Sequence, residues 1–265
     1  LVNKVAYENL RYLCKEIGPR LSGSRQANQA VEWGKNYLSS LEIDTVWKQE
    51  IKVTNWKRGP RGGAFFEIDK QGAKQEKIKG IALGGSIGTN GKWLKAPLFE
   101  VKDIAELESI PDDKIKGHII FINKPMDPRQ IRTFNAYGAC FAQRHRGAVE
   151  AAKKGAVGVW LRSLSLWDDH EPHTGNMKYD EDVKKIPAMA IGTSTADSLH
   201  KLLKKGSINA CMKLNCYQEP DTISHNVIGE LRGSLFPDEY IVIGGHLDSW
   251  DTGEGAHDDG AGIVQ

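Results

Sequence analysis

The feature that most constrains the fold of this chain is a short apolar run, residues 240–243, which leads directly into a segment rich in glycine, aspartate and histidine, residues 244–262. An uninterrupted apolar run of this kind is typical of a strand that is buried on both faces of a parallel sheet. In open α/β sheets, ligands bind beyond the carboxyl ends of the strands. The sequence therefore predicts a buried strand in a mainly parallel α/β sheet, with a functional loop at its carboxyl end.

The side chains of this loop indicate a metal site. Residues 244–262 contain two histidines, four aspartates and one glutamate, and imidazole and carboxylate groups suit a divalent metal of the zinc type. His246 and Asp248 are two residues apart on an extended chain, so we expect Asp248 to accept the proton of the ring nitrogen that does not bind the metal. The glycines permit a sharp turn, which allows Asp258 or Asp259 to return to the metal that His246 holds.

Three interpretations of the loop stay open at this point. A carboxylate that bridges two ions would give the paired-metal arrangement that activates water against an amide or a phosphate. A calcium-binding loop and a surface loop without a ligand are the alternatives, because acidic residues recur at short spacing although EF-hand spacing is absent. Outside this loop, His173 lies on a long loop and is a candidate for reaching a substrate cleft.

Composition excludes several classes of protein. The 36 Lys and Arg residues against 34 Asp and Glu residues leave a net charge of +2, which gives no reason to expect a nucleic acid or an anionic membrane as partner. The longest apolar stretch, residues 155–161, is far shorter than the roughly 18 residues of a membrane-spanning helix. The four cysteines lack C-x-x-C spacing, so we expect buried free thiols rather than a cysteine zinc site or a redox pair. They are Cys14, Cys140, Cys211 and Cys216.

The pattern along the chain indicates two domains. Apolar stripes at helical spacing predict helices at residues 10–17 and 27–41, with a serine cap before the second, and residues 45–53 alternate as a half-buried strand does. A basic, turn-rich stretch at residues 57–63 is typical of a domain boundary. From there to about residue 220 the pattern changes to short strands and helices, with strands predicted at residues 81–83, 98–101, 117–122, 156–161 and 186–191. We therefore expect residues 1–53 and 221–265 to form parts of one domain and residues 54–220 to form an insert.

Three separated motifs resemble one known family. Residues 245–260, with His246-Leu247-Asp248 and Asp258-Asp259-Gly260, resemble the metal-binding signature of co-catalytic zinc peptidases of the carboxypeptidase Q (plasma glutamate carboxypeptidase) type. Residues 17–24 resemble the N-terminal motif of that family, and residues 165–179 resemble its central loop. Residues 147–158 are similar to a helix and strand of a protease-associated domain. The resemblance implies a mainly parallel-sheet zinc exopeptidase domain, interrupted by a protease-associated-type α/β insert.

The resemblance also implies roles for single residues. His246 is expected to bind one of two zinc ions, Asp258 to bridge both, and Asp248 to orient His246, with a cis peptide bond between Asp258 and Asp259. The reaction implied is the hydrolysis of dipeptides or short unblocked peptides by metal-activated water. The general-base glutamate and the other ligands are expected beyond Gln265, so the 265-residue chain alone is expected to be inactive.

The resemblance implies a peptide substrate, and a homodimer is compatible with it. We expect neither a nucleic-acid partner nor a membrane span. The family implies a secreted, periplasmic or lysosomal location, with a signal peptide that is not in this chain. Two alternative functions remain. One is a non-catalytic binding module with a vestigial metal loop, and the other is a hydrolase or cyclase that acts on a non-peptide amide.

Overall fold

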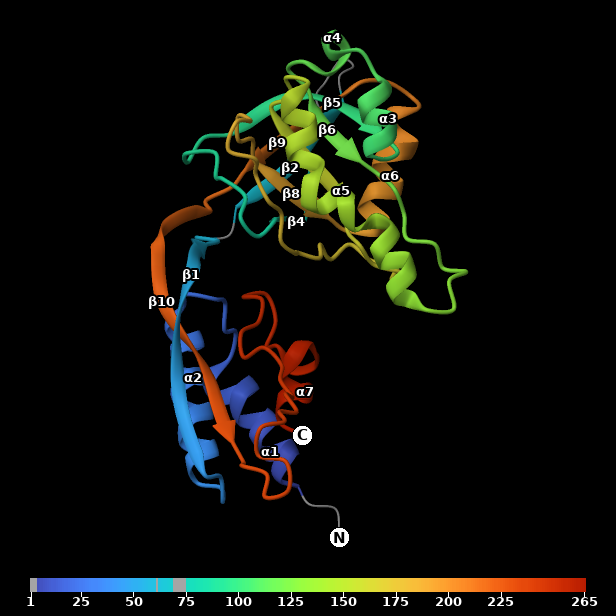
Figure 1. The fold of residues 1–265 in the computed structure, drawn as a ribbon. Coiled ribbons are helices and arrows are strands. Elements are labelled where there is room, and N and C mark those ends of the chain that lie inside the picture. The colour runs from blue at the N-terminus through green and yellow to red at the C-terminus, as the bar shows by residue number, and fades with distance from the viewer. Residues whose placement is uncertain (1–3, 61, 69–74) are drawn as a thin grey trace. The chain divides into compact units, whose positions relative to one another are not determined.

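The computed structural model describes residues 4–60, 62–68 and 75–265, and the chain divides into two compact units (Figure 1). Unit 1 comprises Leu1–Trp56 and Glu219–Gln265, and unit 2 comprises Lys57–Gln218. The predicted domain limits, after residues 53 and 220, lie close to these bounds. Within the predicted boundary stretch at residues 57–63, Arg61 lies outside the described residues.

Unit 1 begins with two helical segments that the apolar stripes predict. Helix α1 (Val5–Tyr12) continues into a π-helical turn, η1 (Leu13–Ile17), which ends at Gly18 with a φ of +79°. Gly18 has a ψ of −152°, and this combination of dihedral angles is open to glycine because it has no Cβ. Helix α2 (Arg25–Ser39) starts behind Ser24, whose Oγ accepts the amide N–H of Ala27 at 3.1 Å. The predicted serine cap is therefore confirmed.

The strands of unit 1 form a two-stranded sheet. Strand β1 (Thr45–Lys57) pairs with β10 (Tyr217–Glu230). The last residue of β1 and the first two residues of β10 belong to unit 2. The chain then passes through a long irregular segment to a turn, η2 (Ala256–Gly260), and a last short helix, α7 (Ala261–Ile263). A small core of unit 1 joins η1 and α2 to the irregular segment and to the α7 region. Its buried members are Leu13, Ile17 and Ala30, with Trp33, Leu247, Ile263 and Val264 packed against them.

The prediction of a buried strand at residues 240–243 is wrong. The side chains of Tyr240, Ile241, Val242 and Ile243 are 73–93% exposed, and the segment has no regular secondary structure. A β-strand requires a neighbouring backbone that pairs with its N–H and C=O groups. None of the described residues pairs with this segment, and the sheet of unit 1 contains only β1 and β10. Apolar character alone therefore does not make this segment a strand.

The centre of unit 2 is a parallel sheet. Strands β5 (Leu94–Val101), β6 (Ile119–Ile122), β7 (Gly158–Arg162) and β8 (Ala188–Ile191) are parallel neighbours. All four residues of β6 and all four of β8 are buried, as strands covered on both faces should be. The sequence predicts these four strands to within a few residues. The parallel strands of the described chain thus lie in unit 2, whereas the sequence analysis placed the main parallel sheet in the other domain.

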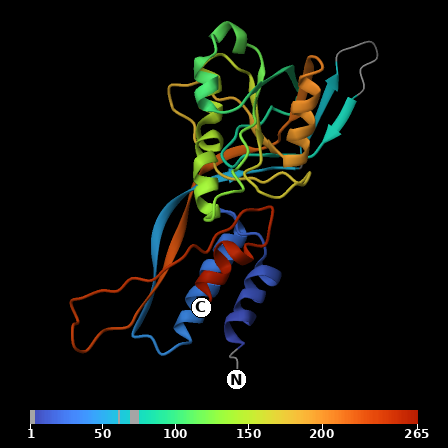
Figure 2. The same cartoon turned by 90° about the vertical axis from the view of Figure 1, so that its right-hand side faces the viewer.

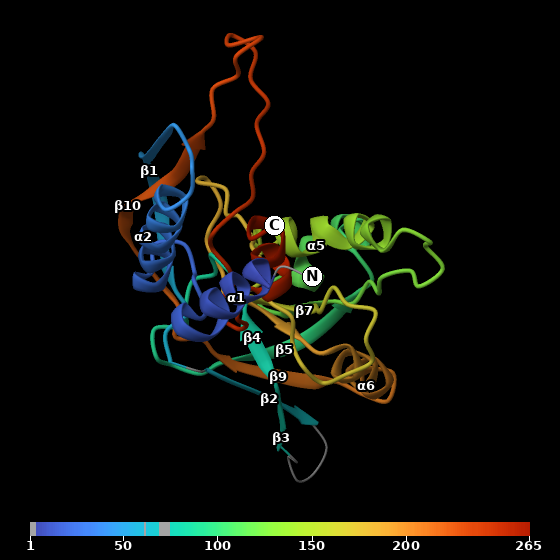
Figure 3. The ribbon, with the colours of Figure 1, turned by 90° about the horizontal axis from the view of Figure 1, so that it is seen from below.

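Antiparallel strands extend this sheet at both edges, giving the order β3-β2-β9-β5-β6-β7-β8-β4. They are β2 (Gly63–Ile68), β3 (Gln75–Ile78), β4 (Gly80–Ala82) and β9 (Ile208–Lys213). The helices of unit 2 are α3 (Ile104–Ser109), α4 (Asp112–Ile115), α5 (Thr133–Lys153) and α6 (Thr193–Leu203). Helices α5 and α6 lie on opposite faces of the sheet (Figures 2 and 3). Unit 2 is therefore a three-layered α/β unit.

The described helices include none that is long and apolar enough to span a membrane. The core of unit 2 is instead built where α3 and α5 meet the parallel strands. It contains Leu107, Ala148, Ala151, Ile120, Ile122, Val159, Leu161, Ala188 and Ala190.

Replacing a core isoleucine of β6 tests this packing. We expect Ile120→Ala to lower the free energy of unfolding by about 2–5 kcal/mol, because Ile120 is fully buried and the smaller side chain leaves a cavity. Ile131→Ala is the matched control, since the Ile131 side chain is fully exposed. Urea-induced unfolding of the two variants, followed by circular dichroism, measures the difference. Equal losses of stability in both variants would contradict the packing described for β6.

Candidate metal centre

His246 lies between the two aspartates that the sequence analysis pairs with it. Its Nε2 is 2.9 Å from Oδ1 of Asp258, and its Nδ1 is 3.0 Å from both Oδ1 and the main-chain oxygen of Asp248. The carbonyl oxygen of Asp248 can only accept a hydrogen bond, so Nδ1 must carry a proton and donate it. Nε2 is then the ring nitrogen that faces Asp258, as the predicted division of roles requires.

The electrostatics of the imidazole reflect these two carboxylates. Burial lowers the pKa of His246, but the hydrogen bonds to Asp258 and Asp248 raise it by more, so the pKa lies above its usual value. The site remains open to solvent, because the side chains of His246, Asp248 and Asp258 are 51%, 47% and 80% exposed. A metal ion arriving from solvent can therefore reach Nε2 and the Asp258 carboxylate.

The donor atoms fit zinc in kind but are two in number. A neutral imidazole nitrogen and a carboxylate oxygen are donors that zinc takes, and Nε2 and Oδ1 are close enough to share one ion. Calcium prefers oxygen donors alone, so the imidazole favours zinc over the calcium alternative. Within residues 4–60, 62–68 and 75–265, no three His, Cys, Asp or Glu side chains gather as a metal site. The described residues thus supply part of a zinc site.

The turn that returns Asp258 to His246 depends on glycines. The peptide bond between Asp258 and Asp259 is cis, as the family resemblance predicts. The Asp259 carboxylate lies against Gly245 and Gly262, where an added Cβ would come within 2.3 Å and 2.4 Å of its oxygens. Larger residues at these two positions would displace Asp259. The glycines of the loop therefore have a packing role as well as a conformational one.

Arg20 is a residue of this site to which the sequence analysis assigned no role. Its side chain is fully buried, and among the described residues it donates hydrogen bonds only to main-chain oxygens. Nε donates to Leu247 at 2.8 Å, Nη1 donates to Glu254 at 2.8 Å, and Nη2 donates to Gly255 at 3.1 Å. Nη1 also donates to Gly18 at 3.0 Å and Leu13 at 3.3 Å. Its place in the motif at residues 17–24 is the one sequence signal that points to it.

Two neighbours complete the surroundings of Arg20. The main chain of Arg20 pairs with Ser249, since the amide of Arg20 donates to Ser249 Oγ and the amide of Ser249 donates to the Arg20 carbonyl, each at 3.0 Å. Gly255 has a φ of +61°, and an added Cβ there would lie 2.7 Å from Nη2 of Arg20 and 2.3 Å from Cβ of Ser249. A side chain at position 255 would therefore push the guanidinium away.

His173, the candidate cleft residue, belongs to unit 2 and not to the unit that carries His246. It is exposed, and its amide donates to Ser163 Oγ at 2.8 Å. Its proposed place in a substrate cleft stays a prediction. Two other histidines have partners within unit 2: His200 Nδ1 lies 2.8 Å from a carboxylate oxygen of Glu100, and His118 packs edge-on against Phe99.

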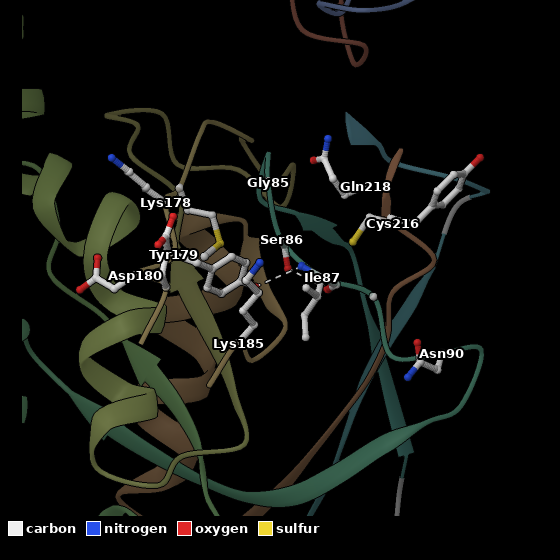
Figure 4. Close-up of a pocket in the computed structure, with 14 residues that line it drawn as sticks. Gly85, Ser86, Ile87, Asn90, Lys178, Tyr179, Asp180, Lys185, Cys216 and Gln218 are labelled. Carbon is white, nitrogen blue, oxygen red and sulfur yellow. Dashed lines mark hydrogen bonds between the residues drawn. The ribbon is translucent and has the colours of Figure 1, made fainter. Parts of the chain in front are cut away.

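A separate cavity in unit 2, with a volume of about 600 Å³, is lined by Ser86, Tyr179, Lys185 and Cys216 among others (Figure 4). Its polar groups are already used by the fold. Tyr179 Oη donates to the carbonyl of Ile186 at 2.6 Å and accepts the amide N–H of Ile87 at 3.1 Å. Burial raises the pKa of the Cys216 thiol to about 11, so this thiol is protonated at neutral pH and is a poor nucleophile. Tyr179 and Cys216 are therefore poor candidates for catalytic groups.

The four cysteines are buried and free, as predicted from their spacing. Burial raises the pKa of Cys211 and Cys216 to about 11 and raises that of Cys140 as well. At pH 8 these thiols stay protonated, so we expect slow reaction with a thiol reagent in the folded protein. In guanidinium chloride without reductant, all four should react quickly. Counting reacted thiols by absorbance checks this, and four rapid reactions in the folded state would contradict it.

Comparison with known proteins gives one family. Residues 226–265 match the model of Peptidase family M28. The chain is 34% identical over 258 residues to carboxypeptidase Q of Xenopus laevis, which covers 97% of this chain and 52% of that protein. The chain thus spans about half the length of the curated relatives that it matches. The resemblance inferred from the motifs is confirmed.

Solved structures give the same result for the fold. A peptidase M28 precursor from Shewanella amazonensis SB2B is 38% identical, with a TM-score of 0.90 over 99% of this chain and 58% of that one. A zinc aminopeptidase from Bacillus subtilis is 21% identical, with a TM-score of 0.64 over 98% of this chain and 55% of that one. These structures confirm the predicted α/β class. That the insert is a protease-associated domain stays a prediction.

Proposed function

We propose that the whole protein is a zinc-dependent exopeptidase. Nearly all of this chain is homologous to carboxypeptidase Q, and residues 226–265 match the model of Peptidase family M28. The substrates of the whole protein are dipeptides or short unblocked peptides, which it hydrolyses with metal-activated water. The observation that carries the proposal is His246 held between Asp248 and Asp258, with Nε2 facing the second carboxylate. The name of the Bacillus subtilis neighbour supports the choice of zinc.

The residues of this chain have distinct parts in that reaction. Zinc, when bound, supplies a water of lowered pKa and polarises the scissile carbonyl. His246 Nε2 and the Asp258 carboxylate would hold the metal, and the second oxygen of Asp258 would be available to another ion. Asp248 accepts the Nδ1 proton, which keeps Nε2 available as a ligand and fixes the plane of the ring.

The one glutamate of the loop is not placed to accept a proton from water. Both carboxylate oxygens of Glu254 lie 2.9 Å from Nζ of Lys15, in an ion pair on the surface. Glu254 is therefore not proposed as the general base. A general-base glutamate elsewhere in the whole protein, two zinc ions and the full ligand set belong to the proposal. The compartment and a homodimer likewise remain predictions that follow from the family resemblance.

Removing the imidazole tests the metal assignment. We expect His246→Ala in the whole protein to abolish dipeptide hydrolysis and to lower bound zinc, because one ligand is lost. His257→Ala is the matched control, since His257 is an exposed histidine of the same loop that takes no part in the His246–Asp258 contact. Hydrolysis rates together with zinc content by atomic absorption give the answer. Normal zinc content and turnover in His246→Ala would contradict the assignment.

The same assay separates the alternative activities. Free dipeptides, N-acyl amino acids and peptides with N-terminal glutamine are compared as substrates of the whole protein. The proposal requires the free dipeptides to be hydrolysed faster than the other two classes. Preference for an N-acyl amino acid or cyclisation of the glutamine would indicate a non-peptide amide hydrolase or a cyclase, and zinc-free, inactive protein would indicate a binding module.

Asp248→Asn tests the orienting role separately from metal binding. The variant keeps the shape of the side chain but weakens the acceptor that faces Nδ1–H, so we expect a loss of activity of about 10–100-fold. Zinc should be lost to a smaller degree than in His246→Ala, because no ligand is removed. Turnover and zinc titration of the two variants are compared side by side. Wild-type turnover in Asp248→Asn would show that Asp248 does not orient the ring.

A further inference from the structure

We propose that Arg20 is the positioning residue of the metal centre: its guanidinium holds the two chain segments that carry His246 and Asp258 against the end of the first helical segment. This inference rests on the proposed function of the His246 site. It assigns to Arg20 a role in metal affinity, beyond a contribution to stability. Arg20 touches neither the metal nor the substrate in this role, and acts through the main chain of its neighbours.

The hydrogen bonds of Arg20 fall on both sides of the metal loop. Leu247, which accepts from Nε, is the residue next to His246. Glu254 and Gly255, which accept from Nη1 and Nη2, precede Asp258 by four and three residues. One planar group therefore fixes the chain just after the first ligand and just before the second. The loop between them is closed through Arg20 instead of through a disulfide or a sheet.

The same guanidinium fixes these segments to the start of the chain. Nη1 also donates to the carbonyls of Leu13 and Gly18, at the carboxyl end of the first helical segment. The carboxyl end of a helix carries partial negative charge, so a buried cation is stabilised there. The Arg20 side chain donates to five acceptors among the described residues, and all five are main-chain oxygens. The oxygens of Leu13 and Gly255 also accept main-chain N–H groups, from Gly18 and Gly260. Losing the guanidinium would therefore remove this donor from the oxygens of Gly18, Leu247 and Glu254 above all, which costs stability.

The main chain of Arg20 adds a third attachment. The reciprocal pair with Ser249 ties the middle of the loop to the same residue. Gly255 has no Cβ, which makes room for Nη2 and for Ser249. His246 and Asp258 therefore arrive at their 2.9 Å contact from segments that are already fixed. A site that is fixed before binding loses less conformational entropy on taking up a metal, and so binds it more tightly.

Lysine cannot replace arginine in this arrangement. Its ammonium is a compact charge with three donors and lacks the planar fork that reaches several carbonyls at once. Arg20→Lys thus preserves the charge and removes the geometry. Lys15→Ala is the matched control, because Lys15 contacts the side chain of Glu254 on the surface, and exposed pairs of this kind contribute little.

The experiment compares wild-type, Arg20→Lys and Lys15→Ala in the whole protein. Zinc affinity is measured by competition with a chromophoric chelator, and the Co²⁺-substituted proteins are compared by visible absorption. Unfolding temperature is measured separately on chelator-treated protein. For Arg20→Lys we expect zinc affinity to fall by about 10-fold or more, as for other residues that orient ligands, with an altered Co²⁺ spectrum. Lys15→Ala should match the wild type in both.

Each outcome decides the proposal. Wild-type affinity and Co²⁺ spectrum in Arg20→Lys, with only the unfolding temperature lowered, would show that Arg20 is merely structural. If Arg20→Lys does not fold, Ser249→Ala gives the decision, because it removes one of the attachments: weaker zinc binding supports positioning, and unchanged binding overturns it. If the wild type itself binds no zinc, the proposed function has failed instead, and the two failures are distinguishable.

Discussion

The burial of one guanidinium is the constraint on which the rest of unit 1 depends. Arg20 has no exposed surface, and each of its side-chain hydrogen bonds ends on a main-chain oxygen. A buried charge is tolerated only when its donors are satisfied, so the carbonyls of both the first helical segment and the metal loop must stay in place together. Two parts of the chain more than 220 residues apart are thereby held as one structure. The small apolar core around Leu13 and Leu247 packs in the same region, so apolar and polar contacts favour the same arrangement.

The elements that the sequence predicts well are those whose causes are local. Ser24 caps α2 because its side chain reaches an amide three residues away, and β6 is recognisable because strands covered on both faces have no polar positions. The His246, Asp248 and Asp258 set is predictable for a similar reason. The short extended segment indicates that Asp248 faces one ring nitrogen of His246, and the glycines allow Asp258 or Asp259 to return to the other. The family resemblance selects Asp258 from these two.

The elements that the sequence predicts poorly depend on distant partners. Residues 240–243 have the composition of a buried strand, but pairing with a neighbour decides whether a strand forms, and composition does not encode the neighbour. The role of Arg20 is also not predictable from the sequence. Its partners are carbonyl oxygens, which every residue carries, so no pattern of acidic residues marks where the cation binds. The roles of Gly255 and Ser249 are hidden in the same way, because each is defined by its contact with Arg20.

The contact between His246 and Asp258 joins two segments of the loop that are twelve residues apart in the sequence. A proton on Nε2 and a zinc ion make the same demand on the surrounding chain, since each is a positive centre that joins the imidazole to the carboxylate. Zinc bound at this pair would take the place of a proton shared between the two side chains. Asp248 keeps Nδ1 as a donor in both states, and Arg20 keeps the segments on either side fixed. With the role proposed for Arg20, zinc would bind Nε2 and Asp258 without first having to order the loop.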